Sequence, residues 1–316
     1  MAFSSLLLPL LVIVAAEAQY LKREYTLTKP YQGSGMDLPN WDFSGSTVVT
    51  NNYIRLTPDR QSKRGMLWNK IPAAIRNWEI QAQFKVHGQG KTLYGDGFAI
   101  WYTKDKSEFG DVFGSRDYFT GLGIFFDTYS NHNGEHAHPH PYVSAIVANG
   151  SVHYDHDRDG THSEVAGCHV QFRNLEEDTH ASILYADRTL TVNLDVDGNY
   201  EWQECFRVEE VDLPAGYYFG VSAATGDLAD NHDIISFKVF ELENKGDDSE
   251  DGWMTAAPAA AKHAAPREHI SDPQSSRQGT SLWTVLFVVF LVVALVCGVV
   301  VYFVFQPDRS RRQRLF

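Results

Sequence analysis

The 316-residue sequence lacks several features that would place it in common classes of protein. Its large N-terminal part has no concentrated stripe of basic residues and the formal net charge is −13, so we expect no nucleic-acid role. No internal repeat is evident, and residues 20–243 contain no long segment with a 3.6-residue hydrophobic period, which argues against a helical domain. Cysteine is also scarce, with three in the whole chain.

What the chain has instead is a series of short segments rich in β-branched and aromatic residues, separated by Gly, Asp and Asn. In WEIQAQFKV, the alternate residues from Ile80 to Val86 are apolar and those between them are polar. This two-residue period is typical of half-buried antiparallel strands. Asp197-Gly198 predicts a hairpin turn. We therefore expect an all-β, antiparallel β-sandwich over residues 19–243.

The two ends of the chain predict a single-pass membrane protein. Residues 1–18 have a short apolar run and then the cleavage pattern Ala16-Glu17-Ala18, so we interpret them as a signal peptide. Residues 282–305 form a continuous apolar run, about 36 Å long as a helix, which is enough to cross a bilayer. The tail, 306–316, carries four arginines and one aspartate, which predicts a cytoplasmic side and a type I topology. The acidic and Ala/Pro-rich residues 244–280 predict a flexible lumenal stalk.

Two further features fit a lumenal location for residues 19–243. Cys168 and Cys205 are the only cysteines there, and an even pair in an oxidising compartment predicts a disulfide. Closing that loop would stabilise the fold by about 4 kcal/mol. Asn149-Gly150-Ser151 is the one glycosylation sequon in the domain.

The acidic stretch YDHDRDGTHSEVAG is the most conspicuous candidate for metal binding. Its opening, through Asp159 and Gly160, matches the start of an EF-hand loop. The twelfth position, however, is Ala166 where a bidentate Glu is needed, and Glu164 comes two residues early. An EF-hand is therefore excluded, which leaves either a solvated turn or a metal site of another kind.

A second acidic loop makes a metal site more favourable than a solvated turn. The apolar run GIFF ends on Asp127, with Asn131 four residues later. These are ordinary turn residues, but they are also hard oxygen ligands for calcium. If both loops lie at one end of the sandwich, Asp127 and Asp159 could bind one cation, with Asn131 and a backbone carbonyl as neutral ligands. The bound ion could then hold Asp96, in YGDGFAI, and Asn131 rigidly toward a ligand.

Several stretches carry a family resemblance: YLKREYTLTKPYQG, IRLTPDRQSKRG, GDGFAIWYTKD, VFGSRDYFTGLGIFFDTYSN, NGSVHYDHDRDG and LPAGYYFGVSAATGDLADNHDIIS. They resemble the legume-like (L-type) lectins of the animal secretory pathway, in particular the branch of vesicular integral-membrane mannose lectins and their ER-resident relative. The resemblance implies a concanavalin-like β-sandwich of jelly-roll type that binds Ca²⁺. It also implies recognition of high-mannose glycans on newly made glycoproteins.

The resemblance also implies individual roles. Calcium would be bound by Asp127, the carbonyl of Tyr129, Asn131 and Asp159. Mannose would be held by Ser62, Asp96, Asn131, His156, Gly226, Asp227 and Leu228. Cys168 and Cys205 match the disulfide positions of the family, and Asn149 matches a sequon seen in this branch. Asn131 would thus contact both the metal and the sugar.

The sequence departs from the family after Asn131, where HNGEHAHPHP contains His132, His136, His138 and His140. One interpretation is a solvated variable loop. The other is a cluster that binds a transition metal or senses pH beside the calcium site.

The tail RRQRLF allows two sorting interpretations besides a plain anchor. Arg311, Arg312 and Arg314 resemble an ER-retrieval signal, and Leu315-Phe316 resembles a hydrophobic pair used for ER export. Both would be bound by vesicle coat proteins. Residence in the ER, the ER–Golgi intermediate compartment or the Golgi is therefore expected.

Three functions compete on these data. We favour a non-enzymatic, calcium-dependent lectin that acts as a cargo or sorting receptor. A glycoside hydrolase on the same fold would need two carboxylates flanking the bond, usually from a Glu-x-Asp-x-x-Glu strand, and GIFFDTY lacks this spacing. A membrane adaptor with a vestigial sugar site is the third.

Overall fold

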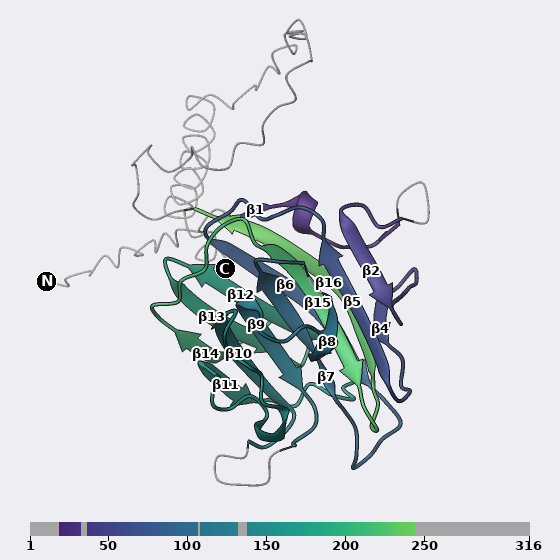
Figure 1. The fold of residues 1–316 in the computed structure, drawn as a ribbon. Helices are drawn as coiled ribbons and strands as arrows, with labels where there is room; N and C mark the ends of the chain where they lie inside the picture. The colour runs from purple at the N-terminus through teal and green to yellow at the C-terminus, as the bar shows by residue number, and fades with distance from the viewer. Residues whose placement is uncertain (1–18, 33–36, 107, 132–137, 244–316) are drawn as a thin grey trace, which may run out of the picture. The chain divides into compact units, whose positions relative to one another are not determined.

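The computed structural model describes residues 19–32, 37–106, 108–131 and 138–243. These residues form two antiparallel β-sheets packed face to face (Figure 1). The prediction of an all-β antiparallel sandwich is confirmed. Within the described residues no helix has the length and apolar character to span a membrane. The predicted signal peptide, stalk, membrane helix and tail lie outside these residues.

The first sheet has the strand order β14-β13-β12-β6-β16-β4-β3, with β1 pairing on β16. Its strands are β1 (Gln19–Leu21), β3 (Val48–Val49), β4 (Ile54–Thr57), β6 (Trp78–His87), β12 (Thr179–Ala186), β13 (Thr189–Asp195), β14 (Gln203–Val208) and β16 (Asn231–Leu242).

The second sheet has the order β11-β10-β9-β7-β15-β5-β2. Its strands are β2 (Trp41–Gly45), β5 (Lys63–Asn69), β7 (Gly97–Thr103), β9 (Thr120–Asp127), β10 (Tyr142–Asn149), β11 (Ala166–His169) and β15 (Tyr218–Thr225). The remaining elements are β8 (Phe109–Val112) and two short 3₁₀ helices, η1 (Arg23–Tyr25) and η2 (His156–Arg158).

Alternation of burial in β6 follows the sequence pattern. Its apolar residues from Ile80 to Val86 are buried against the second sheet, and the polar residues between them are half-buried. The core between the sheets is rich in aromatic rings, including Phe84, Phe98 and Phe126, the last two stacked with ring centroids 4.4 Å apart. Such rings bury large apolar areas, so they provide much of the stability of the sandwich.

The second sheet is covered on its outer face as well. A second apolar cluster there includes Trp101, Phe113, Phe125 and Tyr154. Central strands β7 and β9 are consequently buried along nearly their whole length, which explains why they appear as continuous apolar runs in the sequence. The segments around Phe113 and Tyr154 that cover this face also reach the end of the sheet where the candidate site lies.

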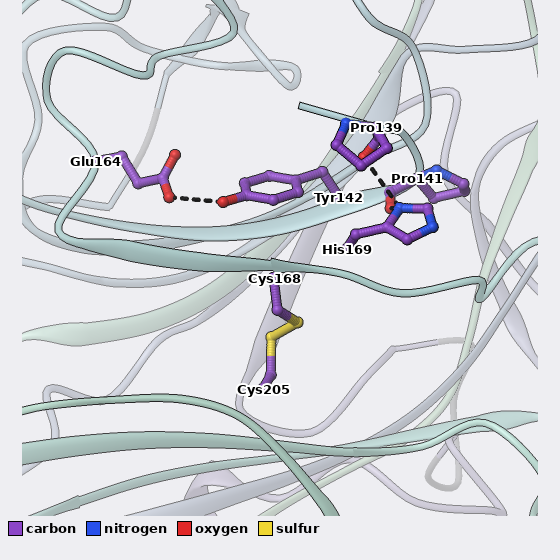
Figure 2. The surroundings of a disulfide bond; sticks show 7 residues. All are labelled: Pro139, Pro141, Tyr142, Glu164, Cys168, His169 and Cys205. Atoms are coloured by element: carbon purple, nitrogen blue, oxygen red, sulfur yellow. Dashed lines mark hydrogen bonds between the residues drawn. A yellow bond between two sulfur atoms is a disulfide. The ribbon is translucent and has the colours of Figure 1, made fainter. Parts of the chain in front are cut away.

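A disulfide joins the edges of the two sheets. Cys168 lies on β11, the last strand of the second sheet, and Cys205 lies on β14, the last strand of the first (Figure 2). The predicted pairing is confirmed. Because it joins strands from different sheets, the bond restrains their separation along one open side of the sandwich.

A buried ion pair holds two of the loops that carry predicted site residues. The guanidinium of Arg173 donates to both carboxylate oxygens of Asp230, at 2.7 and 2.6 Å, and both side chains are almost fully buried. The same guanidinium lies 3.8 Å from the centre of the Tyr94 ring. Tyr94 precedes Asp96, and Asp230 follows Leu228 in the chain. Breaking a buried pair of this kind costs several kcal/mol, so Arg173 fixes both loops firmly.

The imidazole of His232 on β16 makes the stability of the sandwich dependent on pH. Its side chain is 1% exposed, its Nδ1 lies 2.7 Å from the Thr57 hydroxyl, and its Nε2 lacks a hydrogen-bond partner among the described residues. Burial lowers the pKa of His232 to about 3, well below its ordinary value of 6.5.

We predict that His232 contributes stability that is complete above pH 6.5 and is lost progressively as the pH falls toward 3. The unfolded chain takes up a proton near pH 6.5 and the folded chain does not, so the loss at pH 5 is about 2 kcal/mol. Denaturant unfolding of the wild type and of His232→Asn at pH 7 and pH 5 measures this. The variant should lose about 2 kcal/mol less than the wild type between these pH values.

The same change at the exposed His162 provides the control and should leave the pH dependence as it is. An equal pH-dependent loss in the wild type and in His232→Asn would contradict the assignment.

Candidate functional site

The strand register of the second sheet brings three distant segments to one point. Gly97, the first residue of β7, pairs with Asp127 at the end of β9, and it also pairs with Ala224 near the end of β15. Asp96, Asp127 and Gly226 therefore meet at the same edge. A cavity of about 330 Å³ opens there. It is lined by Arg64, Asp96, Asp111, Phe113, Asp127, Tyr129, Asn131, Tyr154, His156, Ala224, Thr225 and Gly226.

The two acidic loops of the sequence converge beside this cavity, as expected. The backbone N–H of Tyr129 donates to Asp127 Oδ1 at 2.9 Å, and the backbone N–H of Asn131 donates to Asp159 Oδ1 at 2.9 Å. The second bond joins one acidic loop directly to the other. Asp159 has a left-handed backbone with φ of +51°, which ends the 3₁₀ helix η2 and turns the chain toward Asn131.

Burial makes these two carboxylates an unusual pair. Asp127 is 8% exposed and Asp159 is 7% exposed. Burial raises the pKa of Asp127, and the charge of Asp159 acts in the same direction, whereas the neighbouring His140 lowers it. Two buried anions are costly unless a positive charge lies between them. The donor set fits a calcium ion, which prefers carboxylate, amide and carbonyl oxygens.

Asp96 provides a second carboxylate, and it faces the cavity. Its carbonyl accepts hydrogen bonds from the N–H and the hydroxyl of Thr128, both at 2.9 Å, so its backbone is fixed against the end of β9. Burial raises the pKa of Asp96 to about 6, with smaller contributions from the charges of Asp127 and Asp227.

Gly226 lies directly over this carboxylate. A Cβ added at Gly226 would be 3.2 and 3.3 Å from the two carboxylate oxygens of Asp96. Only glycine leaves space here for a ligand atom to reach the carboxylate. On another wall of the cavity, the buried Nε2 of His156 lacks a hydrogen-bond partner among the described residues. Its ring packs against Tyr154 at 4.7 Å.

Four of the predicted site residues do not line the cavity but support those that do. The backbone N–H of Ser62 donates to the carbonyl of Gly226 at 3.0 Å, and Gln61 donates to the carbonyl of Asp227 at 2.6 Å. Leu228 lies against Gly95. Asp159 supports Asn131, as described above. The segment 226–228 is thus held in place by the two residues that directly precede β5.

Several cavity residues carried no signal in the sequence. Arg64 and Asp111 form an ion pair of 2.7 Å at the rim, and Phe113 and Tyr154 form part of its wall. Arg64 lies on a strand and Asp111 on another, and only the folded arrangement shows that they meet at the cavity. The alternation of residues along each strand shows on which face of the sheet a side chain lies, but it does not show which residue of another strand that side chain contacts.

The histidine-rich segment is divided by the fold. His138 stacks on Tyr142 at 4.1 Å and lies 3.4 Å from a carboxylate oxygen of Glu164, while His140 lies beside Asp127 and Asp159. His132 and His136 lie outside the described residues. The sequence singled out this segment but did not indicate which histidine reaches the acidic pair.

The predicted glycosylation site lies within the described residues, whereas the predicted sorting residues do not. Asn149 is exposed at the end of β10, where its side chain accepts hydrogen bonds from Ser151. The side chain is therefore accessible for the attachment of a glycan. Its glycosylation remains a prediction. Arg311, Arg312, Arg314, Leu315 and Phe316 lie outside the described residues.

Comparison with known proteins agrees with this geometry. Residues 18–249 match the legume-like lectin family. The chain is 46% identical to the VIP36-like protein of Homo sapiens over 298 residues, which cover 93% of this chain and 86% of that protein. It is 44% identical to the vesicular integral-membrane protein VIP36 of Canis lupus familiaris over 312 residues, covering 96% and 87%.

A solved structure shows the same arrangement. The crystal structure of the VIP36 exoplasmic/lumenal domain, in its Ca²⁺/Man2-bound form, is 50% identical and superposes with a TM-score of 0.70. The match covers 74% of this chain and 94% of that domain. The two-sheet sandwich, the length of the match and these relatives lead to one conclusion: the chain belongs to the legume-like lectin family, whose members are not enzymes.

Proposed function

We propose that the protein is a calcium-dependent lectin that binds high-mannose glycans on newly made glycoproteins and acts as a cargo or sorting receptor in the early secretory pathway. The convergence of Asp96, Asp127, His156 and Gly226 at one cavity, with Asp159 buried beside Asp127, carries this proposal. The relative VIP36, crystallised in a Ca²⁺/Man2-bound form, supports it. The sandwich is then of the concanavalin-like, jelly-roll type.

Calcium would be held by the carboxylates of Asp127 and Asp159, the side chain of Asn131 and the carbonyl of Tyr129. When bound, it would neutralise the two buried anions and fix the loops that carry these ligands. The existing bond between the Asn131 N–H and Asp159 already holds part of this loop beside the site, and the ion would supply the remaining restraint.

The sugar would be recognised mainly by hydrogen bonds. Its hydroxyls can donate to the carboxylate of Asp96 and accept from the amide of Asn131 and from backbone N–H groups of the segment 226–228. The buried Nε2 of His156 gains a partner when a hydroxyl enters the cavity. Ser62, Asp227 and Leu228 complete this part of the site. Cation binding beside Asp96 also favours its ionised, accepting form.

A shallow, polar cavity of this type suits weak binding to single sugars. A millimolar dissociation constant corresponds to about 4 kcal/mol, so receptors of this kind gain from several glycans on one cargo protein. We propose that residues 1–18 are a signal peptide, 244–280 a stalk, 282–305 a membrane helix and 306–316 a cytoplasmic tail bound by vesicle coat proteins. This topology would place the lectin domain in the lumen of the ER, the intermediate compartment or the Golgi.

Removal of the metal should abolish most glycan binding. Binding of the soluble fragment 19–243 to a glycan array should be confined to high-mannose structures in the presence of Ca²⁺. It should fall at least about tenfold with a chelator, since the Asn131 loop then loses its cation. Restoring Ca²⁺ should restore binding. Glycan binding that persists unchanged in the chelator would contradict the proposal. Cargo capture without any glycan binding would favour a membrane adaptor with a vestigial sugar site.

A substitution at Gly226 should affect sugar binding but not metal binding. Gly226→Ala places a methyl group about 3.2 Å from the Asp96 carboxylate and should exclude a sugar hydroxyl from it. Mannose affinity should fall by about tenfold or more, equivalent to at least about 1.4 kcal/mol. Calcium affinity, measured by calorimetry, should stay within about twofold because Gly226 is not a proposed ligand. Unchanged mannose binding by a folded variant would show that the sugar does not lie over Asp96.

A further inference from the structure

The loop between β13 and β14 presents two large aromatic side chains to solvent. Tyr200 is 72% exposed and Trp202 is 41% exposed. β14 is the last strand of the first sheet, so this loop lies at one edge of the sandwich (Figure 1). Neither residue lines the cavity of the candidate site. Tyrosine and tryptophan are frequent energetic centres of protein interfaces, because each buries a large area on binding.

Tyr200 is exposed although its backbone conformation is unfavourable for an aromatic residue. Its φ is +64°, in the left-handed region that a bulky side chain rarely adopts and that glycine adopts readily. One buried carboxylate, that of Asp195, stabilises this conformation, and Asp195 is 2% exposed. It accepts hydrogen bonds from the backbone N–H groups of Asp197, Gly198 and Tyr200, at 3.2, 2.9 and 2.8 Å. The loop is therefore fixed at three points, and the ring is presented in a defined place.

The start of β12 and the residues before it lie beside this loop. The ring of His180 lies 5.3 Å from the ring of Tyr200. Glu177 adjoins Gly198, where an added Cβ would be 3.1 Å from the Cβ of Glu177. Residues 176–178 and 197–204 therefore form one continuous surface around the exposed tyrosine.

This surface carries several negative charges that no basic residue compensates. The stretches 176–178 and 197–204 contain no lysine, arginine or histidine. Asp178 is paired with Lys85 at 3.6 Å. The exposed carboxylates that have no ion pair within the described part of the chain are Glu176, Glu177, Asp197, Glu201 and Glu204. None of these five belongs to a group of described ligand atoms close enough together to hold a metal ion.

Exposed aromatic rings surrounded by carboxylates suit a partner that carries positive charge. A Lys ammonium or an Arg guanidinium over the face of Tyr200 or Trp202 gains a cation–π interaction. The nearby carboxylates attract the same charge over a longer range. They also repel nucleic acids and anionic lipid surfaces, and a neutral sugar gains no charge interaction from them. A basic stretch of polypeptide can contact the rings and the carboxylates at the same time.

We propose that Tyr200, Trp202 and the surrounding carboxylates form a docking surface for a lysine- or arginine-bearing polypeptide segment of a partner protein. The surface shares no residue with the cavity, so it goes beyond the proposed calcium and sugar sites. A partner is then recognised through its polypeptide, whether or not it carries a glycan.

Peptide binding to the soluble fragment 19–243 tests this proposal. The fragment contains both sheets, the described core and the disulfide, and the corresponding domain of VIP36 has been crystallised. The probe is an unglycosylated synthetic peptide of alternating Lys and Gly, and a peptide of alternating Glu and Gly serves as the comparison. Calorimetry should detect binding of the Lys peptide alone, and added salt should weaken it. In NMR spectra of the labelled fragment, the peptide should shift the amide resonances of Gly198 and Tyr200.

Tyr200→Gly removes the ring and keeps a residue that suits the left-handed backbone. The variant should remain folded, which denaturant unfolding checks, while its affinity for the Lys peptide should fall about fivefold, as expected for one exposed cation–π contact. Tyr20→Ala is the matched control. Tyr20 is 54% exposed and its hydroxyl donates to Glu243, but it lies outside the docking surface. This variant should bind the Lys peptide as the wild type does.

The contribution of charge is tested separately. Glu177→Gln combined with Glu201→Gln should weaken binding of the Lys peptide by about threefold or more, because both carboxylates adjoin the tyrosine loop. Glu209→Gln combined with Glu210→Gln changes the net charge equally and should have little effect. Glu209 and Glu210 are exposed and follow the other end of β14.

Four results would overturn the proposal. The first three are equal peptide affinity in the wild type and Tyr200→Gly, equal loss in the two pairs of glutamine variants, and amide shifts that lie away from Gly198 and Tyr200. The fourth is self-association of the fragment that Tyr200→Gly abolishes, without peptide binding, which would assign the surface to a second copy of the chain. Glycan binding should be unchanged in Tyr200→Gly, so a failure of the proposed function leaves the peptide result as it stands.

Discussion

Two carboxylates buried side by side, Asp127 and Asp159, impose the constraint on which the site depends. Each accepts a backbone hydrogen bond from the loop that follows Asp127, at 2.9 Å, so the anions and the loop are fixed together. Removing two such charges from water is costly unless a cation compensates them. In the proposed site, the loop geometry would therefore be coupled to metal binding, and Asn131 would couple the metal to the sugar.

The rest of the sandwich serves to hold this arrangement. Pairing of Gly97 with both Asp127 and Ala224 sets Asp96 against the acidic pair. The second apolar cluster supports the covering segments at Phe113 and Tyr154, and the Arg173–Asp230 pair holds the loops that carry Asp96 and Leu228. Because these contacts are buried and well packed, the side chains of the site need little reorganisation, which lowers the entropic cost of binding a small polar ligand.

Much of this was predictable from local sequence, and the limits have a physical cause. The two-residue alternation in β6 is a local signal, so the strands and the sandwich could be predicted. Asp127 and Asn131 stood out because polar residues end an apolar strand. Arg64 and Asp111, in contrast, meet only through the fold, and the sequence contains no trace of that contact. The histidine-rich segment also stood out in the sequence. That His140, and not another histidine of the segment, lies beside the two carboxylates depends on the backbone that His169 holds in place. The roles of the site residues, the glycan and the membrane topology stay predictions.

Hydrogen exchange at the backbone amides of Tyr129 and Asn131 tests the central claim most directly, because these two N–H groups donate to the carboxylates that would bind the ion. If a cation joins the two acidic loops, both amides should exchange at least about tenfold more slowly in Ca²⁺ than in a chelator, while amides in the centre of β6 should not change. Equal exchange at Tyr129 and Asn131 in both conditions would contradict the account.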